Sequence, residues 1–83
     1  MKKCFVYMVE CSDGSLYTGW TTDVEARIAA HNSGSGAKYT RSRLPVKLVY
    51  SEELEDRSAA LKREAAIKKM TREKKELLIK QGR

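Results

Sequence analysis

Five polar side chains in this sequence are of types that could together cleave a phosphodiester bond: Tyr7, Tyr17, Arg27, His31 and Glu64. A carboxylate can hold one divalent metal ion, and an arginine can bind a phosphate group through a two-pronged contact. A phenol or an imidazole can activate water. These groups form a hydrolytic site only if the elements that carry them converge.

Each of these side chains also has an ordinary structural explanation. A tyrosine in a hairpin commonly packs on the sheet, and a histidine near the end of a helix can act as a cap. Arg27 can pair with Asp23, four residues earlier. A phenol with a pKa near 10 is only about 0.1% ionised at neutral pH, so a catalytic tyrosine needs a cation nearby. Arg27 or a bound metal ion could supply that charge.

Two segments rich in aromatic, β-branched and apolar residues lie on either side of the turn signal "SDGS" and predict a β-hairpin. The length of its loop decides which side chains share a face, because strand residues alternate sides. A two-residue loop at 13–14 places Tyr7 and Tyr17 on opposite faces. A three-residue loop at 12–14 pairs Tyr7 with Gly19, and both tyrosines then face the same way.

A helix is predicted directly after the hairpin. Thr21 and Thr22 can cap its start, and the helix should end near residues 32–34, where asparagine, serine and glycine follow one another. Arg27 and His31 lie four residues apart and therefore point from one face of this helix. Two of the candidate side chains are thus brought together by local structure alone.

The next stretch, "SGSGAKYTRSRLP", predicts a flexible and basic loop. Apolar residues then alternate at Val46, Leu48 and Tyr50, which predicts a third strand. The acidic "EELED" leads from this strand into another helix, which Asp56 or Ser58 can cap.

On that later helix, Glu64 projects from or beside the stripe that faces the core. This is a costly place for an unpaired charge, which favours a functional role for the carboxylate. A last helix should begin near Thr71, bury residues 77–79 and end at Gly82. The apolar positions that bracket Glu64 are Ala60, Leu61, Ala65 and Ile67.

The composition bounds the class of protein. The chain has 83 residues, 41% of them hydrophobic and 34% charged, which predicts one folded domain over residues 1–83 and no membrane span. Its net charge of +6 comes from the second half, because residues 38–83 hold fourteen basic and seven acidic side chains. This excess favours a polyanion as partner. Cys4 and Cys11 lack metal or disulfide spacing and indicate reduced thiols in a cytoplasmic protein.

The sequence resembles the GIY-YIG nuclease family at five places in order. "VYM" at 6–8 and "YTG" at 17–19 are similar to the two halves of the motif, and Tyr17 follows Tyr7 by ten positions. "ARIAAHN" around Arg27 and His31 and "ALKREAAIKKM" around Glu64 also match. The resemblance covers nearly the whole chain and is strongest to small stand-alone bacterial members. It extends to the nuclease domains of the excision-repair incision subunit and the Holliday-junction endonuclease.

The resemblance implies an α+β fold, a small three-stranded antiparallel sheet flanked by helices. It also implies a single Mg²⁺ or Mn²⁺ ion held by Glu64. Tyr17 is then the general base or its relay, Tyr7 orients water, and Arg27 stabilises the phosphate. His31 occupies a position where it competes with Tyr17 as the base. This site requires the three-residue hairpin loop.

The predicted activity is therefore metal-dependent endonuclease or exonuclease cleavage of structured, damaged or single-stranded DNA, in a DNA repair setting with a repair protein as a further partner. The alternative is a module that binds nucleic acid or docks on a repair protein, through a patch around Trp20 or the last helix, with weak or lost nuclease chemistry. A basic loop and basic helices would supply contacts to the DNA backbone. Those predicted contact residues are Lys38, Tyr39, Arg41, Arg43, Lys62, Lys68 and Lys69.

Overall fold

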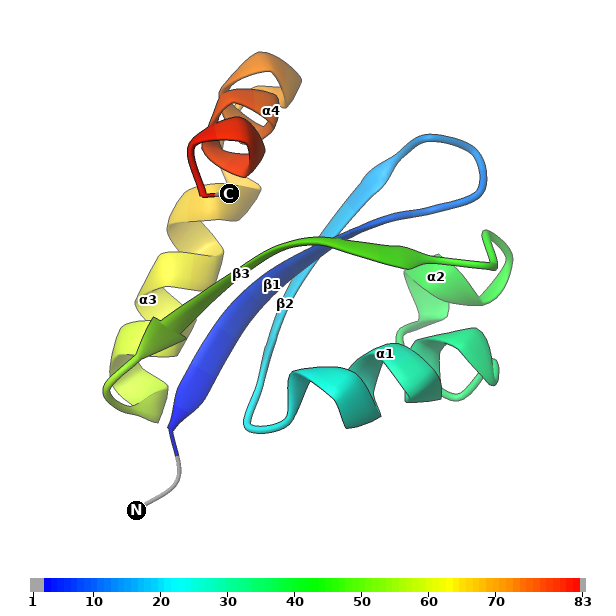
Figure 1. Cartoon of the computed structure of the whole chain (residues 1–83), viewed down its shortest axis with the longest axis horizontal. Coiled ribbons are helices and arrows are strands. Elements are labelled where there is room, and N and C mark those ends of the chain that lie inside the picture. Colours follow the sequence, from blue (N-terminus) through cyan, green and yellow to red (C-terminus); the bar gives the residue numbers. More distant parts are fainter. Residues whose placement is uncertain (1–2, 83) are drawn as a thin grey trace.

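The computed structural model describes residues 3–82 and shows an antiparallel sheet with helices on both sides (Figure 1). The strand order is β2-β1-β3, so the first strand of the chain is the central one. This arrangement confirms the predicted α+β fold. The elements in chain order are β1 (Cys4–Glu10), β2 (Leu16–Thr21), α1 (Val24–Asn32), α2 (Lys38–Arg41), β3 (Lys47–Leu54), α3 (Arg57–Lys68) and α4 (Arg72–Gln81).

The hairpin between β1 and β2 has the three-residue loop. Gly14 has a φ of 84°, and the Cys11 N–H donates to the Ser15 carbonyl over 2.8 Å to close the loop. Tyr7 is consequently paired with Gly19, and Tyr17 is paired with Val9. Both tyrosines therefore lie on the same face of the sheet, as the nuclease-like site requires.

Each face of the sheet has its own hydrophobic core. On one face, Tyr7 and Val9 pack with Ile28 of α1 and with residues of the segment that precedes β3. On the other face, Val6 and Met8 pack against α3 and α4. Figure 1 shows α1 and α2 on one side of the strands and α3 and α4 on the other side. The central strand is thus covered on both sides, which explains its nearly continuous run of buried residues.

Strand β3 contains a bulge that the apolar alternation concealed. Met8 pairs with Tyr50 and Val9 pairs with Leu48, so Val49 is an extra residue on β3. Val46 consequently joins the core on the α1 side, whereas Tyr50 packs on the α3 side. The predicted third strand is confirmed, but the bulge means that the alternating apolar residues from 46 to 50 do not all lie on one face. The strand also runs on to Leu54, through the acidic segment expected to lead into a helix.

Three helix starts are capped by side chains. Asp23 caps α1 by accepting from the Ala26 N–H, so the expectation of a threonine cap is wrong. Asp56 caps α3, as predicted, and Thr71 caps α4. The side chain of the threonine at position 21 instead accepts a hydrogen bond from the Asp23 N–H.

The apolar faces of the two C-terminal helices differ in part from the expected ones. Ala60 and Ile67 are buried, but Leu61 is 41% exposed. On α4, residues 78 and 79 pack on the core while Leu77 is 53% exposed. Helix α4 ends before Gly82, as expected. Within residues 3–82, no helix is both long enough and apolar enough to cross a membrane.

Candidate active site

Tyr7, Arg27 and His31 form one hydrogen-bonded group between β1 and α1. The hydroxyl of Tyr7 lies 2.8 Å from His31 Nε2, and Arg27 Nε donates to the same hydroxyl oxygen over 3.3 Å. Tyr7 is 1% exposed and His31 is fully buried, whereas Arg27 is half-buried. The sequence prediction that Arg27 and His31 point from one face is confirmed. Arg27 bonds to Tyr7, and none of the ion pairs within residues 3–82 joins it to Asp23.

His31 is held on its second ring nitrogen by Thr40 of α2. The distance from Nδ1 to the Thr40 hydroxyl is 2.8 Å, and that hydroxyl donates to the Ala37 carbonyl over 3.0 Å. Thr40 is itself fully buried. The sequence analysis missed this residue, because the stretch that contains it reads as a flexible loop. The alternative of a solvated or capping histidine is wrong, since both ring nitrogens are bonded inside the protein.

Tyr17 lies beside this group and is half-buried rather than buried. Its ring meets the His31 ring edge-on, with 5.4 Å between centroids. On another side it stacks with Tyr39, with centroids 5.8 Å apart and ring planes at 24°. Tyr17 is therefore positioned by ring contacts, and its phenol belongs to the accessible part of the site.

Glu64 approaches the tyrosines from α3, which packs against β1 and the edge strand β2. Its side chain is 17% exposed and pairs with Lys68 over 3.4 Å. The ammonium of Lys68 lies 6.0 Å from the centre of the Tyr17 ring, and the charge of Glu64 contributes to raising the pKa of Tyr7. The structure therefore brings a carboxylate from a distant part of the chain to the tyrosines and Arg27.

Glu64 fits a divalent metal ion of the magnesium type. Within residues 3–82, no group of three or more His, Cys, Asp or Glu side chains gathers into a metal site. Mg²⁺, however, is commonly held by one or two carboxylates, with waters and substrate phosphate completing its shell. A single carboxylate beside phenols and an arginine has this character, whereas a zinc site would need more protein ligands.

Burial sets the resting protonation of the inner group. It lowers the pKa of His31 below its usual value, and the positive charge of Arg27 lowers it further. It raises the pKa of Tyr7, against the opposing hydrogen bond and charge of Arg27. At neutral pH the site therefore contains a neutral imidazole and a neutral phenol at its buried end.

Two glycines make room for the inner side chains. A Cβ added to Gly19 would lie 2.6 Å from the Tyr7 hydroxyl oxygen. A Cβ added to Gly36 would overlap the ring of His31 and lie 2.8 Å from its Cα. Glycine is required at both positions because the backbone passes directly against the site.

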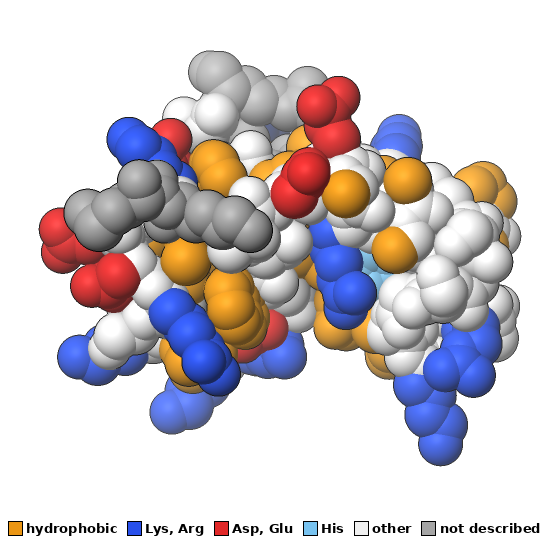
Figure 2. Space-filling model, turned by 90° about the horizontal axis from the view of Figure 1, so that it is seen from below, with side chains coloured by type: hydrophobic (Ala, Val, Ile, Leu, Met, Phe, Trp, Pro, Cys, Tyr) orange, Lys and Arg blue, Asp and Glu red, His pale blue; other side chains and the backbone are white. Residues whose placement is uncertain are grey.

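Some of the predicted DNA-contact residues are exposed, whereas others are engaged in contacts within the protein. Lys38 and Arg41 on α2 are exposed, and so are most of the basic side chains on α3. Arg43 is engaged within the protein, because it pairs with Asp13 over 3.0 Å and lies over the Tyr39 ring. Figure 2 shows Lys and Arg side chains projecting along the lower margin of one face. The exposed lysines of this region are Lys62 and Lys68 on α3 and Lys69 directly after it.

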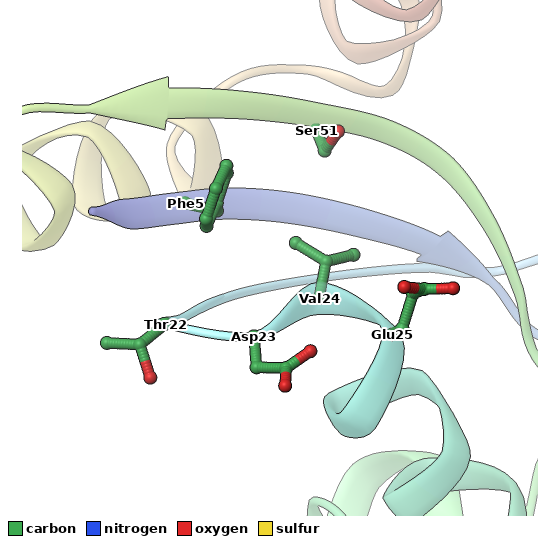
Figure 3. Close-up of a pocket in the computed structure, with 6 residues that line it drawn as sticks. All are labelled: Phe5, Thr22, Asp23, Val24, Glu25 and Ser51. Carbon is green, nitrogen blue, oxygen red and sulfur yellow. The ribbon is translucent and has the colours of Figure 1, made fainter. Parts of the chain in front are cut away.

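A pocket between the start of α1 and the sheet lies apart from the five candidate residues (Figure 3). Phe5 and Val24 supply apolar walls, while Asp23 and Glu25 place carboxylates at its rim. These carboxylates would repel a nucleic-acid backbone, so the pocket is not the candidate site. Trp20 does not form an exposed patch either, because it is half-buried against the core on the α3 side.

Residues 3–77 match the family model described as the GIY-YIG catalytic domain. The chain therefore belongs to the GIY-YIG family, whose catalytic domain defines a nuclease superfamily, and the resemblance found in the sequence is confirmed. Nucleases of this family generally use divalent metal ions.

Within the family, this chain is similar to small UPF0213 proteins. One from Haloquadratum walsbyi is 63% identical over 78 residues, which cover 94% of this chain and 88% of that protein. Another from Syntrophus aciditrophicus is 60% identical over 83 residues, covering 99% and 95%. These relatives match along almost their full length, so they have the same small size.

Solved structures agree with this assignment. The solution NMR structure of a UPF0213 protein from Bacillus halodurans has a TM-score of 0.61 and 47% identity, covering 94% of this chain and 83% of that one. The solution NMR structure of a protein from E. faecalis has a TM-score of 0.66 and 48% identity, covering 98% and 86%. The fold described above is thus shared with both.

Proposed function

We propose that this protein is a metal-dependent DNA nuclease that hydrolyses phosphodiester bonds in structured, damaged or single-stranded DNA as part of DNA repair. The observation that carries the proposal is the anchored guanidinium of Arg27. Its Nε is bonded to Tyr7, and the half-buried side chain stands in the same site as Tyr17 and Glu64. The family match supports nuclease chemistry, and the DNA substrate and repair role are part of the proposal.

Arg27 binds the scissile phosphate in this proposal. Its Nε–H is used by the Tyr7 hydroxyl, which leaves the two terminal nitrogens to donate to phosphate oxygens. A guanidinium fixed in advance loses little freedom when it binds, so its donors stabilise the negative charge that develops on the phosphate during attack.

Tyr17 is the general base in this proposal. His31 is fully buried and both of its ring nitrogens are bonded, so it does not reach a nucleophilic water, whereas Tyr17 is only half-buried. In its phenolate form, the Tyr17 oxygen takes a proton from water as the water oxygen attacks phosphorus. The bond from phosphorus to the leaving oxygen breaks, and that oxygen keeps the bonding electron pair and takes a proton from solvent.

Glu64 would hold the divalent ion, Mg²⁺ or Mn²⁺. When bound, such an ion neutralises charge on the phosphate and the leaving oxygen. Lys68 pairs with Glu64, so its ammonium would give up this contact if a cation bound the carboxylate.

Exposed basic residues on α2 and α3 hold the DNA backbone without reading its sequence. The support for this step is the exposure of Lys38, Arg41, Lys62 and Lys69 together with the net charge of +6. The two cysteines are buried free thiols, which supports a reducing cytoplasmic location. A repair protein remains part of the proposal as the partner that selects the substrate.

The test is cleavage of labelled single-stranded, duplex and branched DNA with Mg²⁺ or Mn²⁺. Glu64→Gln and Tyr17→Phe should each abolish most cleavage while the proteins stay folded and still bind DNA. Glu76→Gln is the matched control, because Glu76 forms the same i,i+4 ion pair with Arg72 on α4. No metal-dependent cleavage of any of these substrates, or equal cleavage by all four proteins, would instead support a module that binds nucleic acid without cutting it.

A further inference from the structure

Thr40 is a buried hydroxyl at the far side of the His31 ring from Tyr7. It is fully buried on the short helix α2, and its oxygen lies 2.8 Å from His31 Nδ1. The same hydroxyl donates to the Ala37 carbonyl over 3.0 Å. A hydroxyl has one proton to donate, so once it is given to Ala37 the oxygen can only accept from His31.

The number of hydrogen-bond donors in the network from Ala37 to Arg27 favours one tautomer of His31. If Nδ1 carries the proton, it donates to Thr40, and Nε2 accepts from the Tyr7 hydroxyl. The Tyr7 oxygen then has lone pairs free to accept from Arg27 Nε. The side-chain polar atoms of Thr40, His31 and Tyr7 all have partners in this arrangement, whereas the Ala37 N–H, 3.4 Å from Nδ1, loses its acceptor.

The opposite tautomer satisfies fewer groups. With the proton on Nε2, the Tyr7 oxygen receives hydrogen bonds from both His31 and Arg27, and the buried phenol proton loses the acceptor that Nε2 provides. Thr40 would have to donate to Nδ1, and the Ala37 carbonyl would lose that hydroxyl. The one contact favouring this state is the Ala37 N–H, which lies 3.4 Å from Nδ1, a longer distance than the 2.8 Å to Thr40.

We propose that Thr40 is a positioning residue that holds His31 in the Nδ1–H tautomer and, through Tyr7, orients the guanidinium of Arg27. The hydroxyl proton of Tyr7 is directed at His31, so the lone pairs of its oxygen are directed at Arg27. A side chain with no contact to substrate thereby controls the phosphate-binding group. The assignment of the tautomer depends only on the hydrogen bonds of the structure, whereas its expected effect on cleavage rests on the proposed nuclease function.

The tautomer can be measured directly, because His31 is the single histidine in the chain. With ¹⁵N-labelled histidine at a pH where the ring is neutral, NMR distinguishes the protonated from the unprotonated ring nitrogen. Wild-type protein should show Nδ1 protonated and Nε2 unprotonated. A protonated Nε2 in the wild type would overturn the proposal, whatever the variants do.

Two variants then separate positioning from packing. Thr40→Val keeps the shape of the side chain but removes the hydroxyl, and it should shift the ring to the Nε2–H form or to a mixture. Thr40→Ser keeps the hydroxyl and should retain the wild-type tautomer. A folded Thr40→Val protein with the wild-type tautomer would contradict the proposal.

Cleavage with Mg²⁺ or Mn²⁺ supplies the second readout. Thr40→Val should lower cleavage by roughly ten- to hundredfold, because a displaced guanidinium binds the phosphate in the wrong geometry. Thr40→Ser should restore most of it. If the wild type cuts no DNA, the proposed function is contradicted, but the NMR measurement still tests the tautomer independently.

Discussion

Arg27 Nε donates to the phenol oxygen of Tyr7 over 3.3 Å, and this bond joins a half-buried cation to a tyrosine that is only 1% exposed. The contact gives the site two layers. Tyr7 and His31 form the buried layer, which orients the accessible layer of Arg27 and Tyr17. The nuclease chemistry proposed above uses the accessible layer, and the variants below separate the two.

Tyr7→Phe removes the oxygen that Arg27 and His31 share while keeping the ring in the core. We expect cleavage to fall at least roughly tenfold, because Arg27 loses its anchor. The free energy of unfolding should fall by about 1–3 kcal/mol, since a buried ring nitrogen of His31 loses its partner. Urea unfolding and DNA cleavage measure the two effects. Tyr50→Phe is the control, because the Tyr50 hydroxyl donates to Glu52 and its ring packs in the core on the other face of the sheet. Unchanged cleavage by the Tyr7→Phe protein would contradict the anchoring role.

Gly19→Ala and Gly36→Ala should both damage the site through the backbone. The new Cβ would lie 2.6 Å from the Tyr7 hydroxyl oxygen in the first case, and it would overlap the His31 ring in the second. We expect a loss of about 1–3 kcal/mol in stability for each, with reduced cleavage at temperatures where the protein stays folded. Ser35→Ala, at an exposed neighbouring position, is the control. Wild-type stability in both glycine variants would show that the site can accommodate the added Cβ atoms, which would contradict the prediction.

The stability of the protein should fall as the pH drops below the ordinary histidine pKa of about 6.5. Burial and the charge of Arg27 lower the pKa of His31 in the folded state, so the unfolded chain binds a proton first. Folding is then penalised progressively from about pH 6.5 down to the lowered pKa. Because the chain has one histidine, urea unfolding between about pH 7.5 and 5.5 reports mainly on this residue. Constant stability across that window would contradict a buried neutral imidazole.

Arg41→Ala and Arg43→Ala should have contrasting effects. Arg41 is exposed, so its loss should weaken DNA binding and reduce the slope of log affinity against log salt by about 1, without changing stability. Arg43 pairs with Asp13 and donates to the Tyr39 carbonyl over 2.8 Å. Its loss should cost roughly 0.5–1.5 kcal/mol in stability and leave the salt slope unchanged. Equal effects of the two variants on binding would show that Arg43 leaves its internal contacts to hold DNA.

Local periodicity was enough to predict much of this protein from its sequence. The two-residue repeat of the strands and the turn signal allowed two hairpin registers, and the family resemblance selected the one that places Tyr7 and Tyr17 on one face. The 3.6-residue period of the helix placed Arg27 and His31 on a common stripe. These relationships depend on residues close together in the chain, where backbone geometry leaves few choices.

The tertiary structure decided what depends on distant contacts. The bulge at Val49, the hydrogen bond from His31 to Thr40 and the approach of Glu64 from α3 have no periodic signature in the sequence. Thr40 lies in a glycine- and serine-rich stretch that predicts a loop, and only packing against α1 makes its hydroxyl a buried partner of the histidine. The residue types that the chemistry needs are therefore set by the sequence. Their orientation follows from which side chains the packed fold buries, and the proposal of Tyr17 rather than His31 as the base rests on that burial.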